Sequence, residues 1–529
     1  MIKILSAEQL RMADEFTISQ QRIKSIDLME RAAESFVECL LRKAYLPPAP
    51  AWFIFCGYGN NGGDALAIAR LLKKDGEEIN VFYLAEKNEY SEDFQTNFER
   101  LKRLKGITPV PISRVEDFPM ISRDAVIIDG LFGSGLNRPL IGLPEKLIRY
   151  LNEQDALRVA IDIPSGLFSD QLTTGTSFHA FYTISFHAPK LSFLFAENAE
   201  AVGYYCVVDI GLSDEVIRSI NTSNLLIEEE DVRQRLRRRK KFDHKGNYGH
   251  ALIHAGSSGK MGAAILCAAA CARAGAGLTT AHVPYQQSVS INAALPEVMT
   301  REYENAPFDF ASMKEISAFA VGPGIGTGNE ARKAVMELLK TVRAPMVLDA
   351  DAINIVASEK KQLALLPPNT ILTPHLKEFE RLAGKTKTWM ERHERQLELS
   401  QKHSLYIVLK GAYTCITTPE GFSFFNPTGN PGMAKGGSGD VLTGMIVSFL
   451  AQRYSAEDAC VLGVYLHGLA ADLAVEFESH HSLMASDIIH NIGAAFRKID
   501  DPEGKAQLQH PGDPDPGDYF HDHDILRLN

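Results

Sequence analysis

Cysteine is scarce in this chain of 529 residues, and none of its seven cysteines belongs to a Cys-x-x-Cys pair. Small secreted scaffolds depend on many paired cysteines, so the cysteine pattern argues against a disulfide-stabilised protein. It fits a reducing compartment, and we expect a cytoplasmic protein.

Long apolar runs and an excess of basic residues are also missing. The most apolar long stretch, residues 263–281, is interrupted by Arg273 and by glycine and threonine, which does not suit a membrane span. The first residues turn polar too early for a signal peptide and lack the composition of a transit peptide. With 66 acidic and 55 basic residues the formal net charge is −11, which argues against nucleic acid or an anionic membrane as a partner.

Strand-like apolar runs alternate with helix-length segments along most of the chain. Residues 1–46 show helical spacing of apolar residues, and PPAP at 47–50 is expected to end these helices. Such alternation predicts an α/β fold with two doubly wound domains built on parallel sheets. The expected strands lie at 51–57, 79–85, 124–130, 157–166, 181–188, 203–210, 250–258, 316–324, 344–351, 369–375 and 405–417.

Changes in composition give the domain boundaries that we expect. The first domain covers 1–215, a charged linker region covers 216–245, the second domain covers 228–500 with its start inside that linker, and a disordered tail follows at 501–529. The basic run 237–241 favours a solvated linker helix, with contact to an anionic ligand as the alternative.

Three small-residue motifs in the first domain follow expected strands. They are GYGNNGGD at 57–64, DGLFGSG at 129–135 and DIPSG at 162–166. A glycine-rich turn before a helix allows close backbone approach and presents free N–H groups to phosphate. The carboxyl ends of parallel strands share one edge of the sheet, so the polar residues of these motifs should converge there. Alternatively, each aspartate only caps a helix or forms a turn.

Together these motifs resemble the YjeF N-terminal family, the epimerases of hydrated NADH and NADPH (NADHX and NADPHX), over roughly residues 1–215. The resemblance implies a Rossmann-like fold, Asp162 as the acid/base at the nicotinamide ring, and a potassium ion (K+) held by Asn61, Asp129 and Ser165. Ala65 stands where the family usually has glycine. The resemblance places the hydrated dinucleotide against Asn60, Asn61, Gly62, Gly63, Asp64, Gly133, Ser134, Gly135, Leu136, Asn137, Arg138, Pro139 and Asp162.

The second domain carries GGSGD at 436–440 before an apolar helical run. The N–H groups of Gly437, Ser438 and Gly439 can form an anion hole for a transferring phosphoryl group. Asp440 can accept the proton of a substrate hydroxyl, as phosphoryl transfer requires. Alternatively, Asp440 only stabilises the start of the helix.

GGSGD resembles the signature of the ribokinase-like superfamily, and further motifs narrow the resemblance to the ADP/ATP-dependent NAD(P)HX dehydratases over roughly 228–500. These motifs are HKGNYGH (244–250), GSSG (256–259), GPG (322–324), LDADA (348–352), TPH (373–375) and KGA (410–412). The resemblance implies magnesium (Mg2+) bridging the phosphates of ADP or ATP. It assigns Lys410, Gly411, Ala412, Tyr413, Thr414 and Gly439 to the nucleotide, and Ala263, Gly324, His375 and Asp440 to the hydrated dinucleotide.

Two positions depart from the dehydratase pattern. Lys435 replaces the usual threonine before GGSGD, where it could hold phosphate or point outward. Leu376-Lys377-Glu378 replaces the usual Pro-Gly-Glu after TPH.

The whole chain therefore resembles the bifunctional NAD(P)H-hydrate repair enzymes. Such an enzyme is an isomerase that interconverts the R and S hydrates at C6. It is also a lyase that dehydrates the S hydrate with ADP, releasing AMP and phosphate. By resemblance we expect a homo-oligomer, and the choices between ADP and ATP and between NADHX and NADPHX stay open.

Two alternatives remain. A vitamin-type small-molecule kinase with a regulatory first domain shares GGSGD, but the GPG and TPH motifs weigh against it. A first domain that only binds or scaffolds would not need Asp129 and Asp162.

Overall fold

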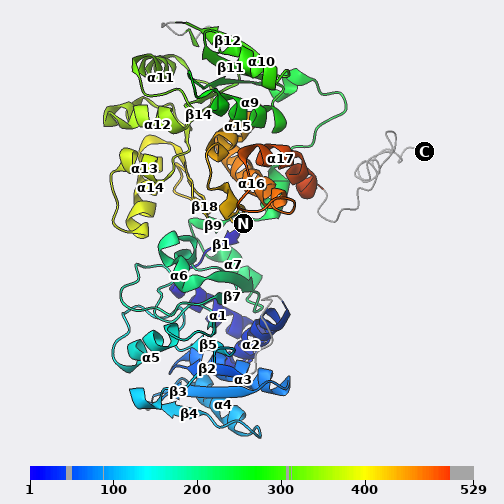
Figure 1. Ribbon diagram of the computed structural model, residues 1–529. Coiled ribbons are helices and arrows are strands. Elements are labelled where there is room, and N and C mark those ends of the chain that lie inside the picture. The colour runs from blue at the N-terminus through cyan, green and yellow to red at the C-terminus, as the bar shows by residue number, and fades with distance from the viewer. Residues whose placement is uncertain (43–50, 87–88, 305–308, 311–312, 501–529) are drawn as a thin grey trace, which may run out of the picture.

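The computed structural model describes residues 1–42, 51–86, 89–304, 309–310 and 313–500, and Figure 1 shows two α/β units placed end to end. The expected helix stop at 47–50 and the expected disordered tail at 501–529 lie outside the described residues. The predicted α/β class with parallel sheets is confirmed. None of the helices in the described ranges is long and apolar enough to cross a membrane.

The sheet of the first unit has seven parallel strands within the described ranges, in the order β4-β3-β2-β5-β6-β7-β8. The chain winds from β2 towards one edge and then from β5 towards the other, so the topology switches between β2 and β5. Ligands of such sheets bind outside the carboxyl ends of the strands at this switch point. The strands are β2 (Trp52–Cys56), β3 (Ile79–Leu84), β4 (Val110–Ile112), β5 (Val126–Gly130), β6 (Leu157–Ile161), β7 (Tyr182–Phe186) and β8 (Tyr204–Val208).

Helices cover both faces of this sheet because alternate side chains of each buried strand point to opposite faces. Ile54 and Ile128 pack in one buried cluster with residues of α1 to α4. Phe55 and Ile127, one position away, pack in another cluster with residues of α5. The helices are α1 (Ala7–Gln21), α2 (Ser25–Arg42), α3 (Asn60–Lys74), α4 (Glu92–Lys102), α5 (Leu143–Asn152), α6 (Ala199–Val202) and α7 (Asp214–Ser219).

The second sheet has eleven strands in the described ranges, in the order β1-β9-β18-β17-β16-β15-β14-β13-β10-β11-β12. Strands from β16 to β12 are parallel, whereas β17 runs antiparallel to both of its neighbours. The strands are β1 (Ile2–Lys3), β9 (Asn224–Leu226), β10 (His250–His254), β11 (Leu278–Pro284), β12 (Met299–Tyr303), β13 (Ala318–Val321), β14 (Met346–Leu348), β15 (Ile371–Leu372), β16 (Tyr406–Leu409), β17 (Cys415–Thr417) and β18 (Ser423–Phe425).

The helix pair α9 and α15 crosses closely in the core of the second unit. A Cβ atom on Gly444 of α15 would lie 2.1 Å from the carbonyl oxygen of Cys267 in α9, so only glycine permits this approach. The helices are α8 (Glu229–Arg235), α9 (Met261–Arg273), α10 (Ser288–Ala294), α11 (Asn329–Thr341), α12 (Ala350–Ala357), α13 (Leu376–Ala383), α14 (Trp389–His403), α15 (Ser438–Ala451), α16 (Ala456–Ala474) and α17 (Ala485–Asp500).

The strand predictions hold for most of the two sheets, with instructive differences. The expected strand 405–417 is two antiparallel strands, β16 and β17, joined by the loop that contains the KGA motif. The segment expected to be only helical at 1–46 begins with β1, which joins the sheet of the second unit by pairing with β9. A strand of two residues carries no periodic signal, so sequence spacing cannot reveal it.

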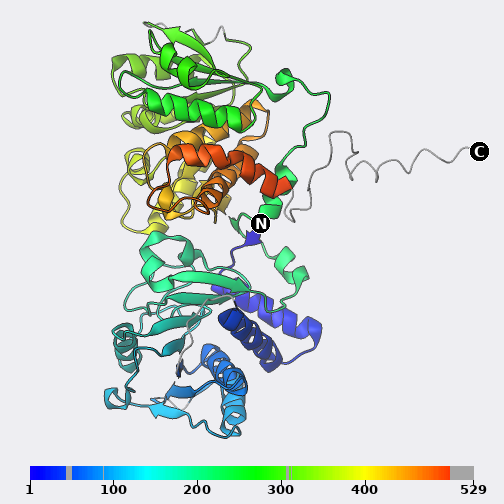
Figure 2. The same cartoon turned by 45° about the vertical axis from the view of Figure 1, so that its right-hand side comes forward.

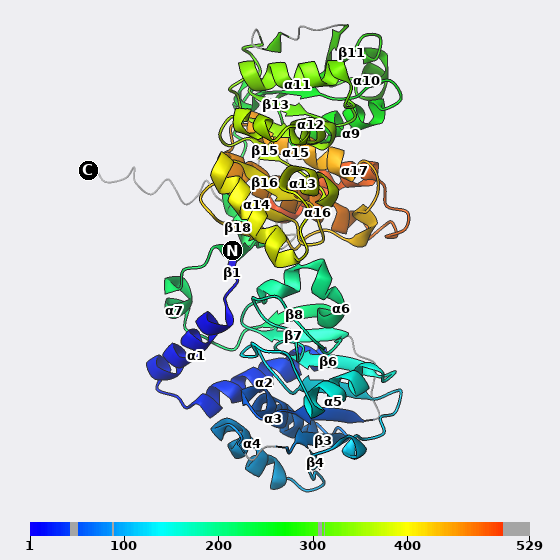
Figure 3. The same ribbon diagram turned by 90° about the vertical axis from the view of Figure 1, so that its left-hand side faces the viewer.

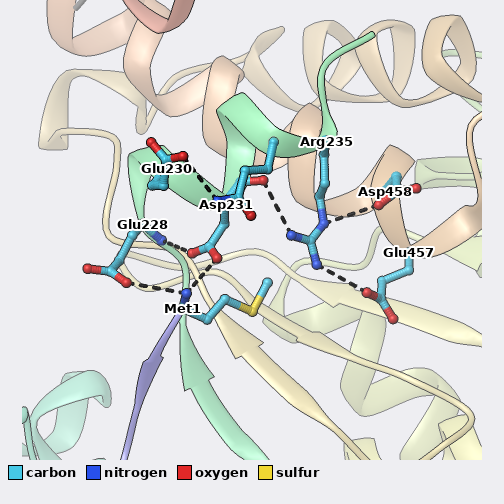
Figure 4. Close-up of polar contacts among 8 residues, drawn as sticks. Met1, Glu228, Glu230, Asp231, Arg235, Glu457 and Asp458 are labelled. Atoms are coloured by element: carbon cyan, nitrogen blue, oxygen red, sulfur yellow. Dashed lines mark hydrogen bonds and ion pairs between the residues drawn. The ribbon is translucent and has the colours of Figure 1, made fainter. Parts of the chain in front are cut away.

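The charged segment 216–245 contains β9 and α8, and it contacts the second unit. Arg235 forms ion pairs with Glu457 and Asp458, and the N-terminal ammonium of Met1 contacts α8 through Asp231 (Figure 4). All views place the N-terminus at the junction of the two units (Figures 1, 2 and 3).

The basic run 237–241 follows α8 and is exposed, but it is not helical, so the expected linker helix ends earlier. Within the run, the guanidinium of Arg237 lies over the ring of Tyr454. Arg239 lies over Tyr248 in the same way. The run is therefore solvated and also anchored to the second unit.

Candidate active sites

The first candidate site lies at the switch point between β2 and β5. A Cβ atom on Gly57 would lie 1.7 Å from the carbonyl oxygen of Leu131, so the turns after these two strands touch. Helix α3 begins at Asn60, and Gly59 before it provides no side-chain cap. The first N–H groups of α3 are thus available to an anionic ligand.

Asp129 and Ser165 tie the ends of β5 and β6 together. The fully buried Asp129 carboxylate accepts hydrogen bonds from Ser165 Oγ at 2.6 Å, Ser165 N at 2.7 Å and Leu131 N at 3.1 Å. Burial raises the pKa of Asp129 to about 6, although these hydrogen bonds oppose the shift. The Asp129 carboxylate therefore holds the two loops together, and a nearby positive charge would stabilise its ionised form.

The residues predicted to hold potassium lie together and offer oxygen atoms. Asn61 is buried against Gly133, where an added Cβ would lie 3.3 Å from Asn61 Cβ. Its Nδ2 atom has no hydrogen-bond partner among the described residues, so the amide is free to turn its oxygen towards a cation. Carboxylate, amide and hydroxyl oxygens suit a hard cation, so Asn61, Asp129 and Ser165 fit potassium.

Asp162 follows β6 and forms a buried ion pair that the sequence interpretation did not include. Its Oδ1 atom lies 2.7 Å from Lys190 Nζ and accepts a hydrogen bond from Phe186 N at 3.1 Å. Lys190 is only 1% exposed, and its ammonium also donates to the carbonyl oxygens of Phe186 and Ala188. The backbone of Asp162 has a φ of 63°, an uncommon value for a residue other than glycine. Lys190 and this backbone conformation fix the direction of the carboxylate.

Asp14 and Asp64 face the same ion pair. Burial raises the pKa of Asp14 to about 7, the charge of Asp162 adds to the shift, and Lys190 opposes it. Burial and then Asp162 also raise the pKa of Asp64 well above its usual value. The predicted site therefore holds three carboxyl groups beside one lysine. Asp14, on α1, is the member that the motifs do not contain.

The loop 133–139 forms the rim of the first site. Its residues are exposed or half-buried, and Ser169 Oγ donates to the carbonyl oxygen of Ser134 at 3.3 Å. Ala65, the departure from the family pattern, is buried close to Gly130, so its methyl group packs against β5 rather than into the rim.

The second candidate site surrounds the start of α15. Gly437 precedes the helix with a φ of 97°, which favours glycine. A Cβ atom on Gly439 would lie 3.2 Å from Lys410 Nζ, so the predicted anion hole and Lys410 are neighbours. Because the first N–H groups of a helix attract anions, this arrangement suits a phosphate group.

Asp349, directly after β14, holds Lys410 in place. Its buried carboxylate lies 2.9 Å from Lys410 Nζ and accepts a hydrogen bond from Thr443 Oγ1 at 2.8 Å. Asp349 belongs to the LDADA motif, but the sequence interpretation gave it no role. The motif's aspartates at the end of a strand were the signal that could have identified it.

Asp440 lies half-buried in the first turn of α15. Burial raises its pKa to about 7, the charge of Asp349 adds to the shift, and Lys410 opposes it. A carboxyl group with a pKa near 7 can both accept and return a proton at neutral pH. Beside it, Ser438 Oγ lies 3.4 Å from Nε2 of the buried His467.

The residues predicted to bind the hydrated dinucleotide come partly together. An added Cβ on Gly324 would lie 3.1 Å from Ala263 Cβ, so these two residues are neighbours. His375 is exposed and caps α13, where its Nδ1 accepts hydrogen bonds from Lys377 N and Glu378 N. Its neighbour Pro374 is joined to Lys410 by a backbone hydrogen bond of 2.9 Å.

Hydrogen bonds show the surroundings of the two positions that depart from the dehydratase pattern. Lys435 is exposed, and its Nζ donates to the carbonyl oxygen of His481. Glu378 is buried and accepts a hydrogen bond from His375 N, so it completes the cap of α13. Cys267 and Cys271 are buried in the core of the second unit.

The fold and the two polar sites define a two-domain α/β enzyme class, and comparisons with known proteins identify its family. The family model for NAD(P)H-hydrate dehydratase matches residues 251–493, and that for the YjeF-related protein N-terminus matches residues 25–192.

Relatives named bifunctional NAD(P)H-hydrate repair enzyme match almost the whole chain. The protein from Moorella thermoacetica is 34% identical over 94% of this chain and 97% of its own length. That from Escherichia coli is 31% identical over 90% of each chain. The crystal structure of the ADP/ATP-dependent NAD(P)H-hydrate dehydratase from Bacillus subtilis, co-crystallised with ATP and Mg2+, is 33% identical, with a TM-score of 0.48 over 52% of this chain and 98% of that one.

The chain therefore belongs to the family of bifunctional NAD(P)H-hydrate repair enzymes. The match extends through both units, so the alternatives of a vitamin-type kinase or a scaffolding first domain are not supported.

Proposed function

We propose that this protein repairs hydrated NADH and NADPH at two separate sites. The first site interconverts the R and S hydrates, and the second returns the S hydrate to NAD(P)H at the expense of ADP. The observation that carries the proposal is the position of Asp440 at the start of α15, beside Lys410 and the buried Asp349.

In the first site, the amides at the start of α3 and the loop 133–139 hold the dinucleotide, and Asp162 acts as the acid and base at C6. It protonates the C6 hydroxyl, which leaves as water to form the N1–C6 iminium, and it takes the proton back when water adds to the opposite face of C6. Lys190 keeps the carboxylate directed at the ring through its 2.7 Å ion pair. Asn61, Asp129 and Ser165 would hold potassium, which would supply a positive charge beside the buried Asp129.

In the second site, Asp440 accepts the proton of the C6 hydroxyl of the S hydrate while that oxygen attacks the terminal phosphorus of ADP. The N–H groups of Gly437, Ser438 and Gly439 and the ammonium of Lys410 stabilise the transferring phosphoryl group. AMP leaves. The phosphate then departs from C6 and takes up the proton that C5 loses, which forms the C5–C6 double bond of NAD(P)H. Mg2+ bound with the nucleotide would neutralise phosphate charge.

Further binding assignments complete the proposal. We place the nucleotide against Lys410, Gly411, Ala412, Tyr413, Thr414 and Gly439, and the hydrated dinucleotide of the second site against Ala263, Gly324, His375 and Asp440. The expected domain boundaries, a homo-oligomer and a cytoplasmic location stay predictions.

The stoichiometry of products tests this function. Pure S hydrate of NADH, incubated with protein, Mg2+ and ADP, should give one AMP and one inorganic phosphate for each NADH formed. Asp440→Asn should stop all three. A stable phosphorylated product without NADH absorbance would contradict the proposal and favour a kinase.

A further inference from the structure

The two domains meet through an apolar cluster to which both contribute. Its buried members include Leu194 from the first domain and Cys415 and Phe425 from the second. Next to the cluster, Phe195 stacks on Trp389 with ring centroids 4.4 Å apart. Figure 3 shows β8 and α6 at the end of the first unit that faces β18.

Within this interface, one tyrosine of the first domain touches the loop that we assign to the nucleotide. Tyr205 on β8 and Tyr413 in the loop 410–414 have ring centroids 6.0 Å apart. Both phenols are half-buried, and after burial the interaction with Tyr413 raises the pKa of Tyr205, as expected for two phenol groups that lie near each other. The second domain's loop thus has a polar partner in the first domain.

Backbone hydrogen bonds hold the two ends of the loop, from Lys410 N to the carbonyl oxygen of Pro374 at 2.9 Å and from Asn426 N to that of Thr414 at 3.0 Å. Between these ends, Thr414 Oγ1 donates to the carbonyl oxygen of Gly411 at 3.1 Å and accepts from Gly411 N at 3.4 Å. Gly411 and Ala412 are exposed. The side chain of Tyr413 therefore links the loop to a rigid neighbouring element, the edge strand β8.

The side chain of Tyr205 packs against other residues of the first domain, which hold it in place. Its ring packs against Phe193 with centroids 5.4 Å apart. Phe193 belongs to the apolar cluster that contains Ile163, inside the motif 162–166, and Leu167, directly after it. Tyr205 therefore lies between the segment that carries Asp162 and the loop that carries Lys410.

We propose that Tyr205 of the first domain is a positioning residue for the nucleotide loop of the second domain. By binding Tyr413 it holds the loop 410–414 in the conformation that receives the adenosine diphosphate. This inference rests on the proposed function of that loop. It predicts that a residue of the first domain raises the affinity of the second domain for the nucleotide.

The test compares Tyr205→Phe, which removes only the hydroxyl, with Tyr204→Phe on the exposed neighbouring residue. Loss of the polar contact between the two phenol groups should raise the KM for ADP about fivefold and leave kcat unchanged. Calorimetric binding of ADP should weaken by the same factor, and epimerisation should be unaffected. Tyr413→Phe should match Tyr205→Phe, and the double variant should add nothing further. Tyr204→Phe should behave as the unmodified protein.

An unchanged KM and an unchanged ADP affinity in Tyr205→Phe, with normal turnover in the unmodified protein, would overturn this inference alone. A fall in kcat without a change in KM would also overturn it, because a positioning role for the nucleotide loop acts on binding. The proposed function would fail, and this inference with it, if the unmodified protein did not bind ADP and the Lys410→Ala variant kept its nucleotide-dependent turnover.

Discussion

Lys190 Nζ and Asp162 Oδ1 lie 2.7 Å apart, with the lysine almost completely buried. This contact joins the chain after β7 to the chain after β6 at the site predicted for epimerisation. Removing one partner of a buried pair leaves the other charge uncompensated, which costs more than the pair itself contributes.

Lys190→Met should therefore abolish epimerisation and lower the free energy of unfolding by about 3 kcal/mol. Lys146→Met, at an exposed position of the same domain, should change stability by less than about 0.5 kcal/mol. Chemical denaturation measures stability, and chromatographic separation of R and S hydrates measures epimerisation. Normal epimerisation by a folded Lys190→Met protein would contradict the assigned role.

The pH dependence of dehydration should follow Asp440. Its pKa is raised to about 7, so the carboxyl group is protonated below that pH and cannot accept the C6 hydroxyl proton. Activity is lost as the pH falls, and kcat/KM for the S hydrate should rise with pH, reach half of its plateau near pH 7 and level off above about pH 8. A profile measured with saturating ADP checks this, and a rate that falls between about pH 6 and pH 8 would count against Asp440 as the base.

Potassium should stabilise the first domain. Heating scans in potassium chloride and in choline chloride of equal ionic strength should differ in Tm by about 2–4 °C, because a bound cation compensates the buried Asp129. Ser165→Ala removes one predicted ligand and should abolish this difference, whatever its own Tm. Equal values in the two salts for the unmodified protein would show that Asn61, Asp129 and Ser165 do not bind potassium.

Gly444 should be intolerant of any side chain. In Gly444→Ala the new methyl group would meet the Cys267 carbonyl oxygen, so α9 and α15 must separate, at a cost of about 1–3 kcal/mol. Gly262→Ala in α9 meets nothing within 4 Å and should be neutral or stabilising, because alanine favours the helix by up to about 1 kcal/mol. Urea denaturation of both variants measures the contrast. Equal stability would show that the helices can move apart freely.

The elements that the sequence predicts well are buried parallel strands, because both faces of such strands are covered and the runs are continuously apolar. Candidate site residues such as Asp129, at the end of β5, and Asp440, in the first turn of α15, could also be predicted, because each belongs to a motif rich in glycine. Asp14 could not be assigned from a motif. Its only local signal is its place four residues after the buried Leu10, on the inward face of α1.

The remaining features that the sequence did not predict are contacts between segments that lie far apart in the chain. Lys190 is a lysine near apolar residues, which by itself predicts only an amphipathic surface position. The pairing of β1 with β9 and the contact of Tyr205 with Tyr413 join segments more than 200 residues apart in the chain. Neither has a periodic or turn signal, because each depends on how the two domains meet.

The most direct test of two cooperating sites starts from a mixture of R and S hydrates of NADH with Mg2+, K+ and ADP, followed by absorbance of reduced nicotinamide. The unmodified protein should convert the whole mixture to NADH. Asp162→Asn should stop at the S fraction, Asp440→Ala should form no NADH while still interconverting the hydrates, and mixing the two variants should restore full conversion. Conversion by the unmodified protein that stops at the S fraction, or loss of both activities in a folded Asp440→Ala protein, would contradict the account.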